Sequence, residues 1–269
     1  VNLSQIKTCQ SATAYAGAFV SVECSSMPQS LLVSRLLGLL DLTSLGEDDS
    51  PTKIRALCAS ACTPYGLPAA VCVYPEHVTS AREALAGTPI KIASVVNFPE
   101  GGDDPQRVHR ETRRALAAGA DEIDMVLAWR ALKAGEVARA KAGVEACRQA
   151  CGTGIVLKLI LETGELANPA LIRHACEIGL DAGVDFLKTS TGKVPVNATL
   201  PAATLMLDAI AERGGQCGLK VAGGIRTLAE AQEYLALVDA KQGPAWATPA
   251  RFRIGASALF DAIVAELER

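Results

Sequence analysis

With 269 residues, 49% of them hydrophobic, the chain can bury the core of one large α/β domain or of two small domains. Its formal charge is −3, and its Lys and Arg residues are scattered. Binding to a phosphate backbone requires a basic face, so nucleic acid is not expected as a ligand. No segment approaches the roughly 20 consecutive apolar residues that span a bilayer, so no membrane partner is expected either.

The nine cysteines indicate free thiols in a reducing compartment. Their number is odd and no Cys-x-x-Cys occurs. Cys58/Cys62 and Cys147/Cys151 have the spacing of helix neighbours, but no nearby His completes a zinc site. A weakly apolar stretch at 12–22 lacks the basic region and the Leu-rich centre of a secretory signal. We therefore expect a cytoplasmic protein.

Strands and helices are expected to alternate along most of the chain. Residues 1–27 are rich in Ser, Ala and Thr without periodicity, and we expect them to form an N-terminal extension. Short apolar runs predict strands at 41–43, 70–74, 91–98, 121–127, 155–162, 185–190, 218–222 and 251–255. Amphipathic runs predict helices at 30–40, 51–61, 76–86, 105–118, 129–150, 166–181, 198–213, 227–239 and 257–268.

About eight strand–helix units in roughly 230 residues predict a (β/α)₈ barrel, the TIM barrel of the α/β class. A doubly wound open sheet usually has fewer strands and often carries a Gly-x-Gly-x-x-Gly turn, which is absent here. No Pro-, Gly- or Ser-rich linker divides the chain. The sequence therefore predicts one barrel domain over residues 28–269.

Lys188 lies in the middle of a short predicted strand. Side chains alternate across a strand, so Phe186, Lys188 and Ser190 share one face. Burying an unpaired ammonium costs several kcal/mol, and loss of the proton avoids that cost and makes the amine a nucleophile. For a single lysine, exposure at the strand end is the commoner explanation.

Three further polar residues are expected beside Lys188, at the carboxyl ends of other strands. They are Asp124, Lys158 and Lys220, each flanked by apolar residues. Any one of them could be solvated or structurally paired, but four converging on a barrel mouth favour a catalytic site. Neighbouring ammonium groups disfavour each other's protonation, so the pKa of one amine can fall from about 10.4 toward 7.

Glycine-rich turns predict a phosphate site. Gly223-Gly224-Ile225-Arg226-Thr227 follows the seventh strand, and Gly255-Ala256-Ser257 follows the eighth. Backbone N–H groups and helix N-termini at these loops bind anions in such barrels, although either turn alone could be ordinary. Thr191-Gly192-Lys193 is not part of a P-loop, because Leu187 and Val194 occupy its required positions. Lys193 and the amides of this turn are instead expected to extend the phosphate pocket.

No metal site is predicted. His77, His109 and His174 fall in predicted helices without ligand spacing, and we expect them at the surface or as helix caps. Cys72 and Asn97 fall near strand ends, where they can line the pocket. For Cys72, the role of a small buried hydrophobe is the more common one.

From about residue 39 to the C-terminus, the chain resembles the deoxyribose-phosphate aldolases. The motifs that carry the resemblance are Asp41–Thr43, Val71–Pro75, Val96–Gly101, Ala120–Asp124, Leu161–Leu166, Asp185–Lys193, Lys220–Thr227 and Arg253–Ser257. They are long, specific and in the expected order. Two positions depart from the family pattern: Val221 replaces a proline, and Ala258 replaces a serine whose hydroxyl would add to the phosphate pocket.

The resemblance implies a metal-independent and cofactor-free aldolase on a (β/α)₈ barrel. Lys188 would form an imine, Lys220 would lower the pKa of Lys188, and Asp124 would relay protons. The reaction implied is the reversible cleavage of 2-deoxy-D-ribose 5-phosphate to acetaldehyde and D-glyceraldehyde 3-phosphate, in deoxyribonucleotide catabolism. A homodimer would fit this family. Expected substrate and phosphate contacts are Asp41, Thr43, Cys72, Lys158, Thr191, Gly192, Lys193, Gly223, Gly224, Arg226, Gly255 and Ser257.

Two other functions stay open. The chain could be another phosphate-binding barrel enzyme, such as an isomerase or a transaldolase-like enzyme. It could also be a sugar-phosphate sensor without catalytic activity. A sensor would be expected to have lost one of Lys188, Lys220 and Asp124, and all three are present.

Overall fold

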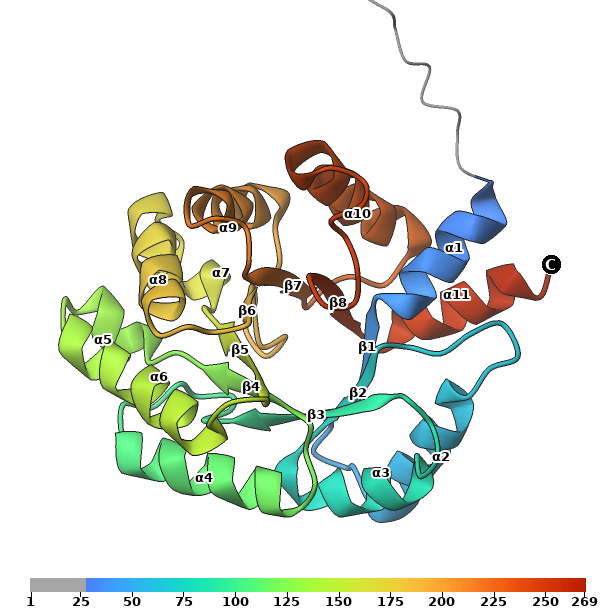
Figure 1. Cartoon of the computed structure of the whole chain (residues 1–269), viewed down its shortest axis with the longest axis horizontal. Coiled ribbons are helices and arrows are strands. Elements are labelled where there is room, and N and C mark those ends of the chain that lie inside the picture. Colours follow the sequence, from blue (N-terminus) through green and yellow to red (C-terminus); the bar gives the residue numbers. More distant parts are fainter. Residues whose placement is uncertain (1–27) are drawn as a thin grey trace, which may run out of the picture.

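Eight parallel strands follow one another around a closed barrel, and β8 pairs with β1 to close it (Figure 1). The computed structural model describes residues 28–269. The predicted TIM barrel is therefore confirmed, while the expected N-terminal extension, residues 1–27, lies outside the described residues. The strands are β1 Leu40–Thr43, β2 Ala70–Val73, β3 Lys91–Val96, β4 Glu122–Val126, β5 Val156–Ile160, β6 Phe186–Lys188, β7 Gly218–Ala222 and β8 Phe252–Ala256.

Several strands end earlier than their apolar runs predict. β3 stops at Val96 because Asn97 has φ 55°, and β5 stops at Ile160, two residues before Glu162, which has φ 57°. A left-handed backbone interrupts the extended conformation that a strand requires. These two turns lie at the carboxyl ends of the strands, where the chain leaves the sheet.

Helices form a ring outside the barrel (Figure 1). Within the described residues they are α1 Gln29–Gly38, α2 Pro51–Ala61, the 3₁₀ turn η1 Pro75–His77, α3 Val78–Ala84, α4 Pro105–Ala117, α5 Trp129–Lys133, α6 Val137–Cys151, α7 Thr163–Leu166, α8 Pro169–Asp181, α9 Leu200–Glu212, α10 Leu228–Gln242 and α11 Ala258–Leu267. The predicted helix 129–150 is divided because Gly135, at φ 81°, ends α5. The predicted helix 166–181 begins only at Pro169, where Asn168 caps α8.

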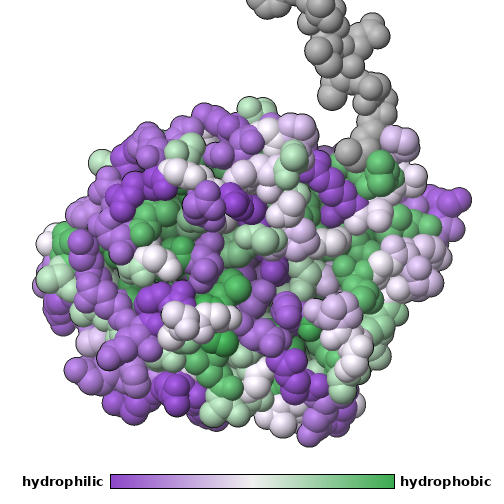
Figure 2. All heavy atoms as spheres, viewed as in Figure 1, coloured by the Kyte–Doolittle hydropathy of each residue, from purple (hydrophilic) through white to green (hydrophobic). Residues whose placement is uncertain are grey.

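The apolar core fills the layer between the strands and the helices. It is built from Val, Leu, Ile and Ala side chains on the outer face of the sheet and the inner faces of the helices. Hydrophilic residues cover much of the face shown in Figure 2, with hydrophobic residues between them. Within residues 28–269 no helix is long and apolar enough to cross a membrane, and all seven cysteines of this range are free.

Candidate active site

Charged side chains occupy the barrel interior, which the apolar strands would otherwise fill. Lys188 is the last residue of β6, but Asp124, Lys158 and Lys220 lie in the middle of their strands. The expectation that all four lie at strand ends is therefore wrong for three of them. The strand register aligns Lys188 with Lys220 and Asp124 with Lys158, which brings the four together deeper in the barrel.

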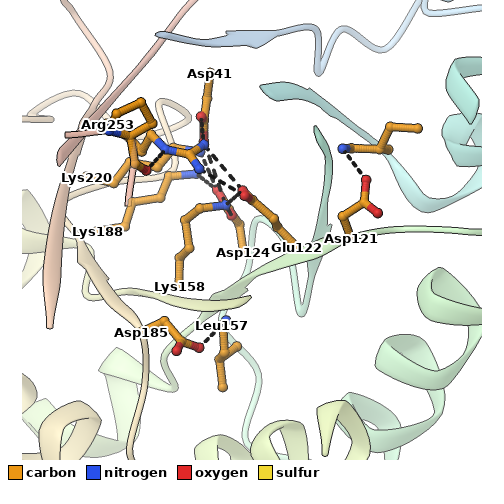
Figure 3. A network of polar contacts seen from close by, with 12 residues as sticks. Asp41, Asp121, Glu122, Asp124, Leu157, Lys158, Asp185, Lys188, Lys220 and Arg253 are labelled. Atoms are coloured by element: carbon orange, nitrogen blue, oxygen red, sulfur yellow. Dashed lines mark hydrogen bonds and ion pairs between the residues drawn. The ribbon is translucent and has the colours of Figure 1, made fainter. Parts of the chain in front are cut away.

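Asp124 is the centre of this group (Figure 3). Its Oδ2 accepts hydrogen bonds from Lys188 Nζ at 2.8 Å and from Lys220 Nζ at 2.7 Å. Its Oδ1 accepts one from Lys158 Nζ at 2.8 Å. All four residues are buried, with Lys188 the most exposed at 3%. A single carboxylate thus holds three amines in the barrel.

Three more charged residues complete the group. Asp41 accepts a hydrogen bond from Lys220 at 2.5 Å, and Glu122 forms an ion pair with Lys158 at 2.5 Å. Arg253 contacts both of these carboxylates, at 2.5 Å from Asp41 and 3.0 Å from Glu122. We call the full set the barrel cluster; its members are Asp41, Glu122, Asp124, Lys158, Lys188, Lys220 and Arg253.

The three lysines of the cluster differ in the direction in which the pKa of the amine is shifted. Burial lowers the pKa of Lys220 and Lys158, but attraction by neighbouring carboxylates outweighs burial and raises the pKa of both amines above their ordinary value. For Lys188 burial dominates and Lys220 adds repulsion, so its pKa is lowered although Asp124 opposes the shift. Desolvation is therefore the larger cause of the lowered pKa, whereas repulsion between the lysines was the cause predicted from the sequence.

Asp124 itself remains a carboxylate. Burial alone would raise its pKa, but Lys158, Lys188 and Lys220 together hold the pKa well below its usual range. A carboxylate that shares one oxygen with two amines can accept a proton from a neighbouring group and return it. The arrangement therefore combines a lysine of lowered pKa with an adjacent base.

A cavity of about 500 Å³ opens above Lys188 at the carboxyl ends of the strands. Its walls carry four cationic residues, Lys53, Lys188, Lys193 and Arg226, and no acidic residue of the described chain. Of the predicted contacts, the cavity is lined by Thr43, Thr191, Gly192, Lys193, Gly223, Gly224, Arg226, Gly255 and Ser257. Such a cavity favours an anionic ligand.

Glycine at 223 shapes one side of this cavity. Gly223 has φ 86°, and a Cβ atom there would lie 2.7 Å from the Asn197 side chain. No acceptor within residues 28–269 takes the N–H groups of Gly223 and Gly224, so both are available to an anion.

The two helix N-termini expected to face the anion differ in how they are capped. At the start of α10 Glu230 Oε2 accepts hydrogen bonds from the N–H groups of Arg226 and Thr227, which precede the helix, and the Thr227 hydroxyl accepts one from the Glu230 N–H, which completes a capping box. The Ser257 side chain makes no such cap on α11. The anion site therefore combines the Gly223–Gly224 turn with the start of α11.

Three predicted contacts do not reach the cavity wall. Asp41, Cys72 and Lys158 are fully buried beneath it. Asp41 and Lys158 belong to the barrel cluster, and burial raises the pKa of the Cys72 thiol. These residues can act on a ligand only through the groups above them.

Sequence reasoning missed Lys53. It lies on α2, away from any strand end, and is held at the cavity rim by ion pairs of 3.0 Å with Asp48 and Asp49. The Asp49 side chain is 1% exposed and also accepts hydrogen bonds from Ser44 Oγ and the Gly46 N–H. The only available signal was an acidic pair four and five residues before a lysine, which ordinarily indicates a solvated helix start.

Glu162 was also missed, although it orders the rim. It is fully buried, two residues after the end of β5, and accepts hydrogen bonds from Thr191 Oγ1 at 2.6 Å and Thr191 N at 3.2 Å. Burial raises its pKa, against the effect of these hydrogen bonds. On the other side of the same loop, Lys193 Nζ donates to the Leu45 carbonyl at 2.6 Å. The two contacts fix the loop that follows β6.

The histidines lie apart from the site. His77 is buried in η1, so the expected surface position is wrong for it; it occupies the N-cap position of α3, but its side chain makes no capping hydrogen bond. In the described part of the chain, no group of three or more His, Cys, Asp or Glu side chains is arranged to hold a metal ion.

Known proteins share this barrel. The model of the DeoC/LacD aldolase family matches residues 36–260. A Coccidioides immitis structure, provisionally described as a deoxyribose-phosphate aldolase, is 30% identical with a TM-score of 0.77, and the match covers 87% of this chain and 86% of that one. A Toxoplasma gondii structure with the same provisional description is 28% identical, with a TM-score of 0.81 and coverage of 89% and 96%.

A deoxyribose phosphate aldolase from Aeropyrum pernix, described as a tetramer, is 22% identical with a TM-score of 0.68 over 90% of this chain and 97% of that one, and shares the fold. The family match extends from the end of α1 into α11 and includes every strand of the barrel. The chain therefore belongs to the DeoC/LacD family of aldolases.

Proposed function

We propose that the protein reversibly cleaves 2-deoxy-D-ribose 5-phosphate to acetaldehyde and D-glyceraldehyde 3-phosphate through an imine on Lys188. The observation that carries this proposal is the position of Lys188. Its amine has a lowered pKa, contacts a carboxylate at 2.8 Å, and lies at the base of a cavity lined by cationic groups. The relatives described as deoxyribose-phosphate aldolases support the choice of substrate.

The first steps form the imine. The neutral Lys188 amine adds to the C1 aldehyde of the open-chain sugar, and the resulting carbinolamine loses water to give a protonated imine. The proton on the departing oxygen comes from the groups around Asp124, whose Oδ2 lies within hydrogen-bonding distance of the amine. The imine cation then acts as an electron sink.

Cleavage breaks the C2–C3 bond. The C3 hydroxyl loses its proton to a water that passes it to Asp124, because Asp124 is fully buried and does not line the cavity. The C3–O bond becomes a carbonyl, and the electrons of the broken bond form an enamine at C1–C2. D-Glyceraldehyde 3-phosphate leaves. Asp124 returns the proton to the enamine carbon through the water, with Lys220 stabilising the carboxylate at 2.7 Å, and hydrolysis releases acetaldehyde.

The phosphate would be held far from the reacting bond. The Gly223–Gly224 turn and the start of α11 offer N–H groups, while Lys193, Arg226 and Lys53 offer positive charge. Anchoring the phosphate there positions C1 above the Lys188 amine. We place this reaction in deoxyribonucleotide catabolism in the cytoplasm.

Borohydride reduction tests the proposal. Incubation with the deoxysugar phosphate and borohydride should add covalent mass at Lys188, located by peptide mass spectrometry, and should inactivate the enzyme. A control without sugar should keep its mass. Turnover without any trapped adduct would contradict the imine and would favour another phosphate-binding barrel chemistry.

A further inference from the structure

Arg253 and Glu122 lie at the end of the barrel cluster that is remote from the substrate cavity. Arg253 is the second residue of β8 and Glu122 the first residue of β4. Both line a separate cavity at the N-terminal mouth of the barrel, and neither lines the cavity above Lys188. They cannot touch a substrate bound there, so any catalytic effect must act through the cluster.

The barrel cluster holds unequal numbers of charges. With every member ionised, four cations (Lys158, Lys188, Lys220 and Arg253) face three carboxylates (Asp41, Glu122 and Asp124), a surplus of one positive charge. All seven side chains are 6% exposed or less. An unbalanced charge in a site withdrawn from water is costly, and loss of one proton relieves it.

Lys188 is the member that can most easily lose that proton. Its Nζ contacts one carboxylate oxygen, Asp124 Oδ2, and shares that oxygen with Lys220. Lys220 has two carboxylate partners, and Lys158 has two within 2.8 Å and a third at 3.7 Å. The guanidinium of Arg253 does not deprotonate in proteins.

Arg253 also occupies carboxylates that would otherwise compensate the lysines. Its Nη1 donates to Asp41 Oδ1 at 2.5 Å and its Nη2 to Glu122 Oε1 at 3.0 Å, and its Nε donates to the Pro249 carbonyl. The guanidinium is thus fixed on three sides. The charge that makes the cluster unbalanced is held in place by the last strand of the barrel.

We propose that Arg253 is a positioning residue that keeps the Lys188 amine nucleophilic by supplying the surplus positive charge of the barrel cluster. The proposal rests on the proposed function, in which the neutral amine attacks the substrate. Other titratable groups that act on Lys188 are Asp124 on β4, Lys220 on β7 and the Cys72 thiol on β2, with Glu162 after β5. The test leaves all of them unchanged.

A series of charge variants tests the proposal through the pH dependence of two quantities: kcat/KM, and the rate of borohydride trapping of acetaldehyde at Lys188. Arg253→Met removes the surplus charge, so the Lys188 amine should stay protonated up to a higher pH. The acid limb of both pH profiles, where activity falls because the amine is protonated, should then move to higher pH by on the order of half to one unit. Glu122→Gln raises the surplus to two, so the limb should move to lower pH.

Two control variants keep the surplus at one. The double variant Arg253→Met/Glu122→Gln and the single variant Arg253→Lys should both bring the acid limb back close to that of the unaltered enzyme. A role of Arg253 in folding alone would lower activity without this pattern of opposite shifts and restoration.

An unmoved acid limb in Arg253→Met, or shifts of both single variants in the same direction, would overturn the proposal. If circular dichroism shows that Arg253→Met does not fold, Glu122→Gln and Arg253→Lys still test the proposal. An unmoved acid limb in Glu122→Gln, or a shifted acid limb in Arg253→Lys, contradicts the charge count. Lack of any adduct at Lys188 in the unaltered enzyme would instead contradict the proposed function, and this proposal with it.

Discussion

The two mouths of the barrel differ in a way that cavity size does not indicate. The N-terminal mouth opens into about 910 Å³, against about 500 Å³ above Lys188. Its charged side chains are largely in ion pairs: Glu122 with Arg253, Asp185 with Arg148, and Arg213 with Asp181. The smaller cavity has four cationic residues, no acidic residue from the described chain, and N–H groups without acceptors.

The difference shows where binding free energy remains to be gained. Charges that already have partners must lose them before they can bind a ligand, so a cavity lined by ion pairs offers little. At the smaller cavity Lys53 and Lys188 also have carboxylate partners, but Lys193 and Arg226 form no ion pair with the described residues, so their charge remains to be compensated by an anion. The following predictions test this contrast between the mouths, from the largest expected effect to the smallest.

Removal of the amine should have the largest effect. Lys188→Ala should reduce kcat by more than about a thousandfold, because no other described amine contacts both the cavity and Asp124. Steady-state cleavage assays measure the loss. Activity retained above a few per cent would assign the imine to another residue.

Lys220→Met should change the pH dependence. The substitution removes a positive neighbour of Lys188 and leaves Asp124 Oδ2 to Lys188 alone, and both changes favour the protonated amine. Activity requires the neutral amine and falls as the pH drops below its pKa. Raising that pKa should therefore shift the acid limb of kcat/KM upward by about one to two units. A pH–rate profile with an unmoved limb would contradict the coupling.

Gly223→Ala should weaken phosphate binding and stability together. The backbone at φ 86° is unfavourable for alanine, and the new methyl group would meet Asn197 at 2.7 Å. Strain of this kind costs on the order of 1–3 kcal/mol. Thermal unfolding should show a lower Tm and substrate titration a higher KM for the phosphorylated sugar. Gly87→Ala, at a similar φ of 81° but with no atom within 4 Å, isolates the backbone contribution.

Matched lysines compare the two mouths directly. Lys53→Met at the active-site rim should raise KM for 2-deoxyribose 5-phosphate by about three- to tenfold, because one charge-assisted contact to a phosphate is lost at a half-exposed position. Lys91→Met at the N-terminal mouth should leave KM within about twofold. With non-phosphorylated 2-deoxyribose the two variants should behave alike. Equal KM values with the phosphorylated sugar would show that the rim lysine does not contact the phosphate.

The sequence contained enough information for the barrel and for the group around Lys188. Parallel strands are buried on both faces and therefore appear as apolar runs, and a charged residue inside such a run, such as Lys158 or Lys220, is conspicuous. The depth of these residues could not be inferred, because strand stagger sets the layer at which side chains meet. For the same reason, the role of Glu122, at the start of its strand, was not recognised.

Lys53 shows a second limit of prediction from the sequence. It reaches the cavity from a helix, and its place at the rim depends on the fold of the β1–α2 loop, in which Asp49 binds both the lysine and the loop backbone. Nothing in its local pattern separates it from an ordinary surface ion pair. Contacts of this kind are defined by tertiary structure rather than by spacing along the chain.

The closure of β8 onto β1 has a consequence for the newly synthesised chain. Asp41 comes from the first strand, whereas its partners Lys220 and Arg253 come from the last two. A chain that still lacks β8 can neither close the barrel onto β1 nor bring Arg253 to Asp41 and Glu122. The burial and the contacts that set the state of the Lys188 amine are therefore complete only after the last strand has been synthesised.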